Sequence, residues 1–210
     1  SSIRRRPALW TTRISWILLP LTTGALMEAA LSSAARPSQV VCAVGAWVLW
    51  AVVLIGVFAR RPWGLTALRT LGPTPLLVAI AGAIASNVSW VALLHGVVVL
   101  AAISLPETGA EMVDGVSYGD ERRLLLRPPF GLYLGPLPLV WSAIVVGATA
   151  GPLLLAARQW IVGGALALIG IPVVLLGSRS LHQLSRRWIV FVPNGFVIHD
   201  LLATREPFLL

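Results

Sequence analysis

Lysine is absent from this chain, cysteine occurs once, and charged residues of either sign are scarce. All sixteen basic residues are arginine, there are eight carboxylates, and charged residues make up 11% of the 210 positions. A soluble domain carries about 25% charged residues, so this composition excludes an ordinary soluble domain. The single cysteine, Cys42, excludes an internal disulfide and a cysteine-based metal framework.

The motifs of common catalytic and binding sites are also missing. The sequence has no nucleotide-binding glycine loop, no nucleophile elbow and no His-Glu-x-x-His zinc helix. Nucleic-acid binding requires a basic patch on a folded surface, whereas the arginines here form short clusters beside apolar runs. We therefore expect no metal, no cofactor and no nucleic-acid partner.

Long apolar runs dominate the sequence instead. About 20 apolar residues span the roughly 30 Å core of a bilayer. A polar segment, residues 106–136, separates the fourth run from the fifth. The sequence predicts an all-α membrane protein whose six-span transmembrane domain covers residues 1–187. The expected spans are residues 14–35, 40–59, 64–86, 88–105, 137–157 and 160–178.

The arginines predict the orientation. When the N-terminus is placed in the cytoplasm, only Arg36 and Arg158 fall outside, which leaves fourteen arginines on the cytoplasmic side. Short cytoplasmic loops carry an excess of basic residues, so this asymmetry is the positive-inside pattern. We expect a multi-pass protein of the bacterial inner (plasma) membrane with both termini in the cytoplasm.

The tail, residues 188–210, changes to a strand-like pattern. Residues 188–192 and 196–199 are rich in β-branched and aromatic side chains and flank Pro193-Asn194-Gly195. An Asn-Gly pair suits a type I′ turn, so the tail predicts a cytoplasmic β-hairpin turning at Asn194-Gly195. A lone hairpin is marginally stable. We expect a third strand from about Arg205, strands beyond Leu210 or a partner surface to complete this β appendage.

Glu28 and His95 are the intramembrane polar pair of the sequence. Counted from the predicted span ends, both lie in the outer half of the bilayer, and intramembrane ionisable residues are candidates for function. One interpretation is a Glu–His pair in a proton or substrate path. The alternative, which we favour, is a neutral Glu28 bonded to backbone or hydroxyl groups and a His95 that packs against its neighbours.

Three further sets of residues carry weaker signals. Gly147 and Gly151 form a small-xxx-small pattern that permits close helix packing, either within the chain or with another subunit. Arg122, Arg123, Arg186 and Arg187 are placed to contact anionic lipid headgroups. The carboxylates of residues 106–136 lack the spacing of a calcium-binding loop, and a solvated loop is the favoured interpretation.

Residues 114–123 (DGVSYGDERR), 126–129 (LRPP) and 185–200 (SRRWIVFVPNGFVIHD) resemble an uncharacterised family of actinobacterial integral membrane proteins. The resemblance covers roughly the second half of the chain. The tail also resembles the opening hairpin of the small bacterial pleckstrin-homology-like domains. No catalytic residue follows from either resemblance.

These observations favour a non-catalytic role, as a structural or accessory subunit or an envelope scaffold. The expected partners are the lipid bilayer and a membrane-protein partner subunit, with the oligomeric state left open. The runner-up is a small proton-coupled transporter using Glu28 and His95. A membrane enzyme acting on lipids is the third alternative.

Overall fold

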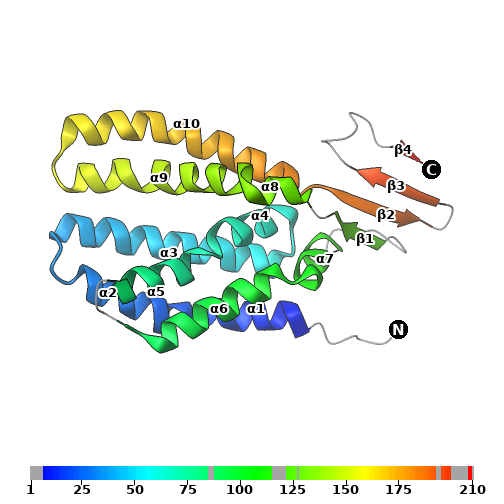
Figure 1. The fold of residues 1–210 in the computed structure, drawn as a ribbon, viewed down its shortest axis with the longest axis horizontal. Coiled ribbons are helices and arrows are strands. Elements are labelled where there is room, and N and C mark those ends of the chain that lie inside the picture. Colours follow the sequence, from blue (N-terminus) through cyan, green and yellow to red (C-terminus); the bar gives the residue numbers. More distant parts are fainter. Residues whose placement is uncertain are drawn as a thin grey trace.

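The structure is a computed structural model that describes residues 7–84, 88–114, 122–126, 128–192, 195–199 and 208–209. The helices run along the long axis of the molecule, and a small sheet lies beyond one end of them (Figure 1). The N-terminus lies at the same end as the sheet.

The first span is three segments long: α1 (Pro7–Leu19), a π-helical turn (Pro20–Gly24) and α2 (Ala25–Leu31). It begins at Pro7 rather than at residue 14. Proline suits a first helical turn because that N–H has no partner there in any case. The hydroxyls of Thr11 and Thr12 donate to the carbonyls of Pro7 and Ala8, both at 2.9 Å, so these two polar side chains are satisfied within the helix.

The second span is α3 (Arg36–Ala59), and the third is α4 (Pro62–Leu71) followed by α5 (Thr74–Ile84). The fourth starts with α6 (Trp90–Ser104), whose N-terminus is capped by the Ser89 hydroxyl accepting from the Ala92 N–H at 3.3 Å. It continues after a 55° bend as α7 (Pro106–Asp114). The turn expected near Asn87 lies outside the described residues.

The last two spans form a long hairpin. A short helix, α8 (Phe130–Leu134), precedes α9 (Pro136–Ala156), and α10 (Trp160–Leu184) follows after a tight turn. Arg158 in that turn has a φ of 64°. At its other end, α10 extends to Leu184, whereas the expected sixth span ended at residue 178. Residues 106–136, expected as a polar loop, contain α7, a strand and α8.

Five of these helical segments are long and apolar enough to cross a membrane, and the bent pair α6–α7 makes a sixth, counted over the described residues. Only 11% to 28% of the residues in the most apolar stretch of each of the five are buried within the molecule. A soluble bundle buries such faces against its own core. The apolar surfaces are therefore consistent with a membrane location.

Over the described residues, the sheet has four antiparallel strands in the order β1 (Arg122–Leu125), β2 (Trp188–Val192), β3 (Gly195–His199) and β4 (Phe208–Leu209). The tail hairpin is thus present, and β4 is the expected third strand. The remaining strand of the sheet, β1, was not expected. It comes from the segment between α7 and α8, with Leu124 opposite Ile189.

The hairpin connection differs from expectation by one residue. Val192 pairs with Gly195, so Gly195 belongs to β3 and the two connecting residues are Pro193 and Asn194. Both connecting residues lie outside the described part of the chain, so the type of turn expected at Asn194-Gly195 is not tested. The register of the β2–β3 pair places Gly195 opposite Val192, so Gly195 is the first residue of β3 rather than part of the turn.

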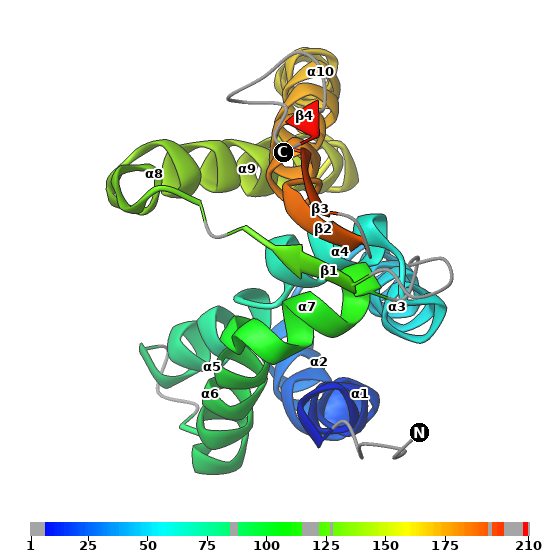
Figure 2. The ribbon, with the colours of Figure 1, turned by 90° about the vertical axis from the view of Figure 1, so that its right-hand side faces the viewer.

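The main core lies at the strand-bearing end, where α1, α3, α4, α6 and α7 meet the sheet. Figure 2, seen from that end, shows the strands crossing over the helix ends from α7 toward α10. The core residues pack in one cluster: Leu9, Trp16, Leu19, Val53, Val57, Leu65, Leu68, Val99, Ile103, Met112, Val113 and Trp188.

Candidate functional site

The structure places Glu28 and His95 in different surroundings. Glu28 is exposed on α2, whereas His95 Nδ1 lies 2.7 Å from the hydroxyl of Thr22. The early start of the first span explains the difference. Glu28 is about 31 Å along this span from Pro7 at 1.5 Å per residue, which places it near the far end. His95 is only about 8 Å from the start of α6, at the level of Thr22 rather than of Glu28.

The Thr22–His95 contact lies at a break in the first span. Thr22 belongs to the π-helical turn that follows Pro20, and π-turns inside helices are frequent at functional sites. His95 Nε2 and the Thr23 hydroxyl are both buried without a hydrogen-bond partner. Sequence reasoning selected His95 but not its threonine partner, because Pro20 gave no sign that the helix continues through a π-turn.

The four arginines expected at lipid headgroups have different surroundings. Arg186 is exposed, but Arg187 is buried, so its side chain does not lie on the surface. The Arg123 guanidinium lies 5.8 Å from the ring centroid of Trp188, and the backbone N–H of Arg123 donates to Oδ1 of Asp114 at 3.4 Å. Arg122 belongs to β1, and its side chain lies outside the described residues.

The small residues of α9 lie against α10 of the same chain. A methyl group at Gly147 would stand 3.1 Å from the Gly170 carbonyl oxygen, and one at Gly151 would stand 2.8 Å from the Ala167 Cα. Glycine at these two positions lets the backbones of the hairpin approach closely.

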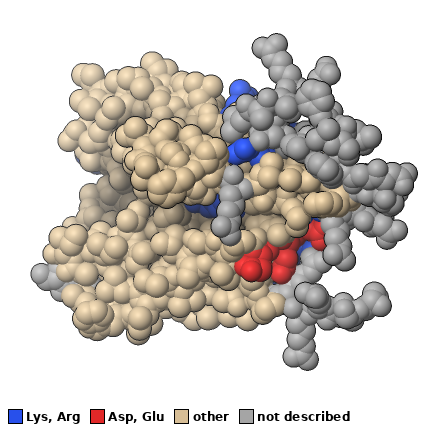
Figure 3. Space-filling view, turned by 45° about the vertical axis from the view of Figure 1, so that its right-hand side comes forward, with Lys and Arg blue, Asp and Glu red and all other residues tan. Residues whose placement is uncertain are grey.

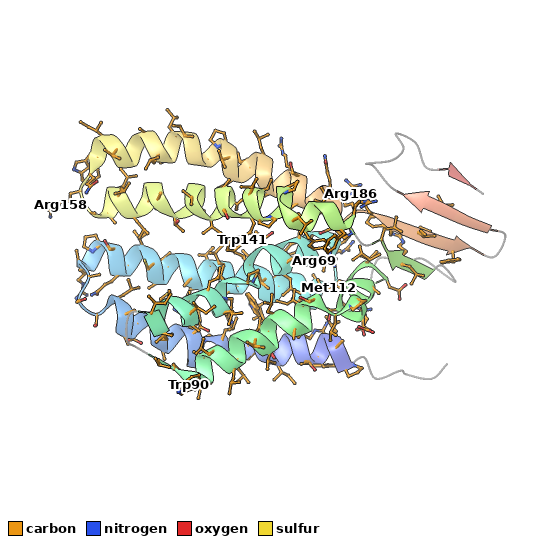
Figure 4. All side chains as sticks on the ribbon, viewed as in Figure 1. Arg69, Trp90, Met112, Trp141, Arg158 and Arg186 are labelled. Carbon is orange, nitrogen blue, oxygen red and sulfur yellow. The ribbon has the colours of Figure 1, made fainter. Side chains whose placement is uncertain are left out.

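Two polar contacts join this hairpin to α4. The Trp141 indole N–H of α9 donates to the Thr70 carbonyl at 2.6 Å, and the Thr66 hydroxyl lies 2.8 Å from Nδ1 of His182 on α10. Figure 4 shows Trp141 between α9 and α4. Helix α4 is therefore the element on which both helices of the hairpin are positioned.

A pocket of about 500 Å³ opens beside α4 at the strand-bearing end. Arg69 of α4 supplies its charge, and Ser104 and Tyr133 supply hydroxyl groups. The remaining lining residues are Pro106, Leu125, Pro128 and Phe130. Figure 4 places Arg69 near Arg186, at the opposite end from Arg158, and Figure 3 shows basic side chains inside a hollow at this end. Over the described residues, the pocket thus combines the cation of Arg69 with largely apolar walls.

Arg69 has no carboxylate partner among the described residues. One of its terminal nitrogens lies 3.1 Å from the position that a Cβ would take at Gly109, so the guanidinium rests against the backbone of α7. A half-buried arginine without a counter-ion is costly, because its charge has lost part of its hydration. The arrangement is chemically suited to an anion that supplies the missing charge.

One sign of this pocket is present in the sequence, because Arg69 interrupts the apolar run of the third span. The other walls come from α6, β1 and α8, which are up to about 60 residues away. These walls meet Arg69 only because β1 and α8 pack beside α4 in the folded chain, and no local sequence pattern predicts that packing.

The fold defines a class: a mostly helical protein with five or six helices of transmembrane length and a small sheet at one end. Comparison of the chain with protein-family models, curated proteins and solved structures gives no match.

Proposed function

We propose that this chain is a multi-pass protein of the bacterial inner membrane, with both termini in the cytoplasm, and that it serves as a non-catalytic scaffold or accessory subunit. The resemblance to the actinobacterial membrane family is part of this proposal. A membrane-protein partner subunit, beside the lipid bilayer, is its expected partner.

One observation carries the proposal. Strand β1 belongs to the segment before α9, and β2 to β4 belong to the tail after α10. The sheet extends from the end of α7 to the end of α10, so it joins the α9–α10 hairpin to the other helices (Figure 2). Such a sheet fixes the hairpin α9–α10 relative to the other helices. It also places β1 at an edge of the sheet, where the backbone N–H of Arg123 is already bonded to Asp114 but the Leu124 side chain is exposed. Exposed positions on edge strands commonly contact partner segments.

Site-specific photo-crosslinking in native membranes tests this role. A photoreactive residue replacing Leu124 should give one discrete adduct with a partner protein, in a stoichiometric amount. The matched control replaces Ile169, which is exposed on the apolar face of α10 and should crosslink mainly to lipid. If neither position gives a discrete protein adduct, the scaffold proposal is wrong.

The second candidate, a small proton-coupled transporter, is favoured by the surroundings of His95. A buried imidazole nitrogen without a partner, next to a π-turn, can accept a proton inside an apolar region. Proteoliposomes holding a pH-sensitive dye should then show a proton flux that His95→Phe abolishes. Thr11→Ala, an exposed position on α1, is the control and should leave the flux unchanged.

A further inference from the structure

We propose that the Arg69 pocket binds the phosphate of an anionic membrane lipid. This inference rests on the proposed membrane location and goes beyond the scaffold role. It concerns residues of four separate elements: Arg69 on α4, Ser104 on α6, Leu125 on β1, and Phe130 and Tyr133 on α8.

The charge of the pocket selects an anion. Among the described residues that line it, only Arg69 is charged, and no described carboxylate pairs with its guanidinium. Guanidinium groups bind phosphate oxygens through two parallel N–H bonds, which is a stronger and more directional contact than a neutral hydrogen bond. The Tyr133 hydroxyl supplies a further donor at the same pocket, whereas the single O–H of Ser104 already donates to the Leu100 carbonyl at 2.7 Å.

The position of the pocket matches the headgroup region of a bilayer. Arg69 is about 10 Å along the third span from Pro62 at 1.5 Å per residue, so its long side chain reaches the interface on the arginine-rich side. The short helix α8 lies directly before Pro136, where the fifth span begins. Both parts of the pocket therefore lie where the fifth and third spans leave the apolar core.

The apolar walls favour a lipid over a free phosphate ion. Phe130, Tyr133 and Leu134 expose most of their side-chain surface on α8, next to the charged part of the pocket. Aromatic residues are typical of the membrane interface. A phosphate with an attached acyl chain satisfies both parts of the site, whereas inorganic phosphate satisfies Arg69 and leaves the apolar side chains exposed.

The test uses the full chain in detergent, titrated with phosphatidylglycerol or phosphatidylcholine and followed by native mass spectrometry and thermal unfolding. The wild type should bind one phosphatidylglycerol in preference to phosphatidylcholine. Replacing Arg69 by Gln should weaken phosphatidylglycerol binding about tenfold, the effect of losing a charged hydrogen bond. Arg61→Gln is the matched control, because Arg61 is an exposed arginine at the start of the same helix.

An equal loss in the Arg61→Gln and Arg69→Gln variants would overturn the proposal, because it would show a general effect of surface charge. Inorganic phosphate is the second arm. If it stabilises the wild type as much as the lipid does, and only when Arg69 is present, the ligand is free phosphate and the lipid assignment is wrong.

A second variant keeps the proposal testable if Arg69→Gln does not fold. Tyr133→Phe changes an exposed residue and should weaken phosphatidylglycerol binding about threefold, since it removes one neutral donor. Unchanged binding in a folded Tyr133→Phe protein, together with no lipid preference in the wild type, contradicts the site. The crosslinking experiment is independent of these results, so failure of the scaffold role and failure of the lipid site are distinguishable.

Discussion

Trp16 and Trp50 exchange hydrogen bonds between α1 and α3. The Trp16 indole N–H donates to the Trp50 carbonyl at 3.0 Å, and the Trp50 indole N–H donates to the Trp16 carbonyl at 2.8 Å. The carbonyl of Trp16 lacks its usual backbone donor within the helix. Its usual helical donor, four residues later, is Pro20, which has no N–H. The second indole thus replaces a missing backbone donor.

Replacing Trp50 by Phe should lower the free energy of unfolding by about 1–3 kcal/mol, because it leaves the carbonyl of the buried Trp16 without this donor. Thermal and denaturant unfolding in detergent measure the change. The control is Trp47→Phe on the same helix, since Trp47 is 57% exposed, and its effect should stay within about 0.5 kcal/mol. Equal effects at both positions would refute the role assigned to the Trp50 indole.

Single residues were predictable only where the sequence around them carries the reason. His95 was identified as a polar residue within a span, but its partner Thr22 depends on where the first span begins. Arg69 stood out within an apolar run, but its pocket depends on distant segments. Glu28 lies farther along its span than the predicted start at residue 14 implies, because the first helix already begins at Pro7.

At the scale of elements, glycine determines where helices approach most closely. The α3–α4 contact is an example, because a methyl group at Gly56 would lie 2.6 Å from the Cα of Gly64. Packing between helices in a membrane relies on such small residues, since lipid and side chains are equally apolar. Gly45 lies on the same helix α3 with nothing within 4 Å of its Cβ position.

The two glycines of α3 should therefore respond in opposite ways to alanine. Gly56→Ala should destabilise the protein, because the backbones of α3 and α4 must separate to admit the methyl group. Gly45→Ala should be neutral or stabilising by up to about 1 kcal/mol, the difference in helix propensity. Unfolding temperatures of the two variants in one detergent give the comparison, and a Gly56→Ala protein as stable as the wild type would contradict the close contact.

Helices were easier to predict than strands in this chain. Apolar runs of about 20 residues indicate spans directly, although the helices extend past the runs where proline begins them, as at Pro7 and Pro136. The strand β1 has only four residues, Arg-Arg-Leu-Leu, with no alternation of apolar and polar side chains. It becomes a strand because β2 offers an unpaired edge, which is a tertiary cause.

At the scale of the whole molecule, the distribution of arginine predicts a fixed orientation. Figure 4 shows Arg158 at one end of the helices and Arg69 and Arg186 at the other. A cysteine at the exposed position Ser33 should be labelled in intact cells by a thiol reagent that cannot cross membranes. A cysteine replacing Leu124 should react only after permeabilisation. Both variants carry Cys42→Ala to remove the native thiol, and the reverse pattern of labelling would invert the topology.

The arrangement of the helices was not predictable from the same residues. In a membrane, the faces turned to lipid and those turned to other helices are both apolar, so periodicity does not separate them. The pairing instead depends on glycine contacts and on a few polar bonds such as Trp141 to Thr70. Those bonds connect segments that the sequence leaves about 70 residues apart.

The sheet also imposes an order on the synthesis of the protein. The ribosome makes β1 before the last two helices and makes its partner β2 after them. At about 5–20 residues per second, the edge of β1 waits roughly 3–13 s for its partner. The sheet can close only when the α9–α10 hairpin has been completed. Pairing of β1 with β2 therefore always follows the synthesis of the last two helices.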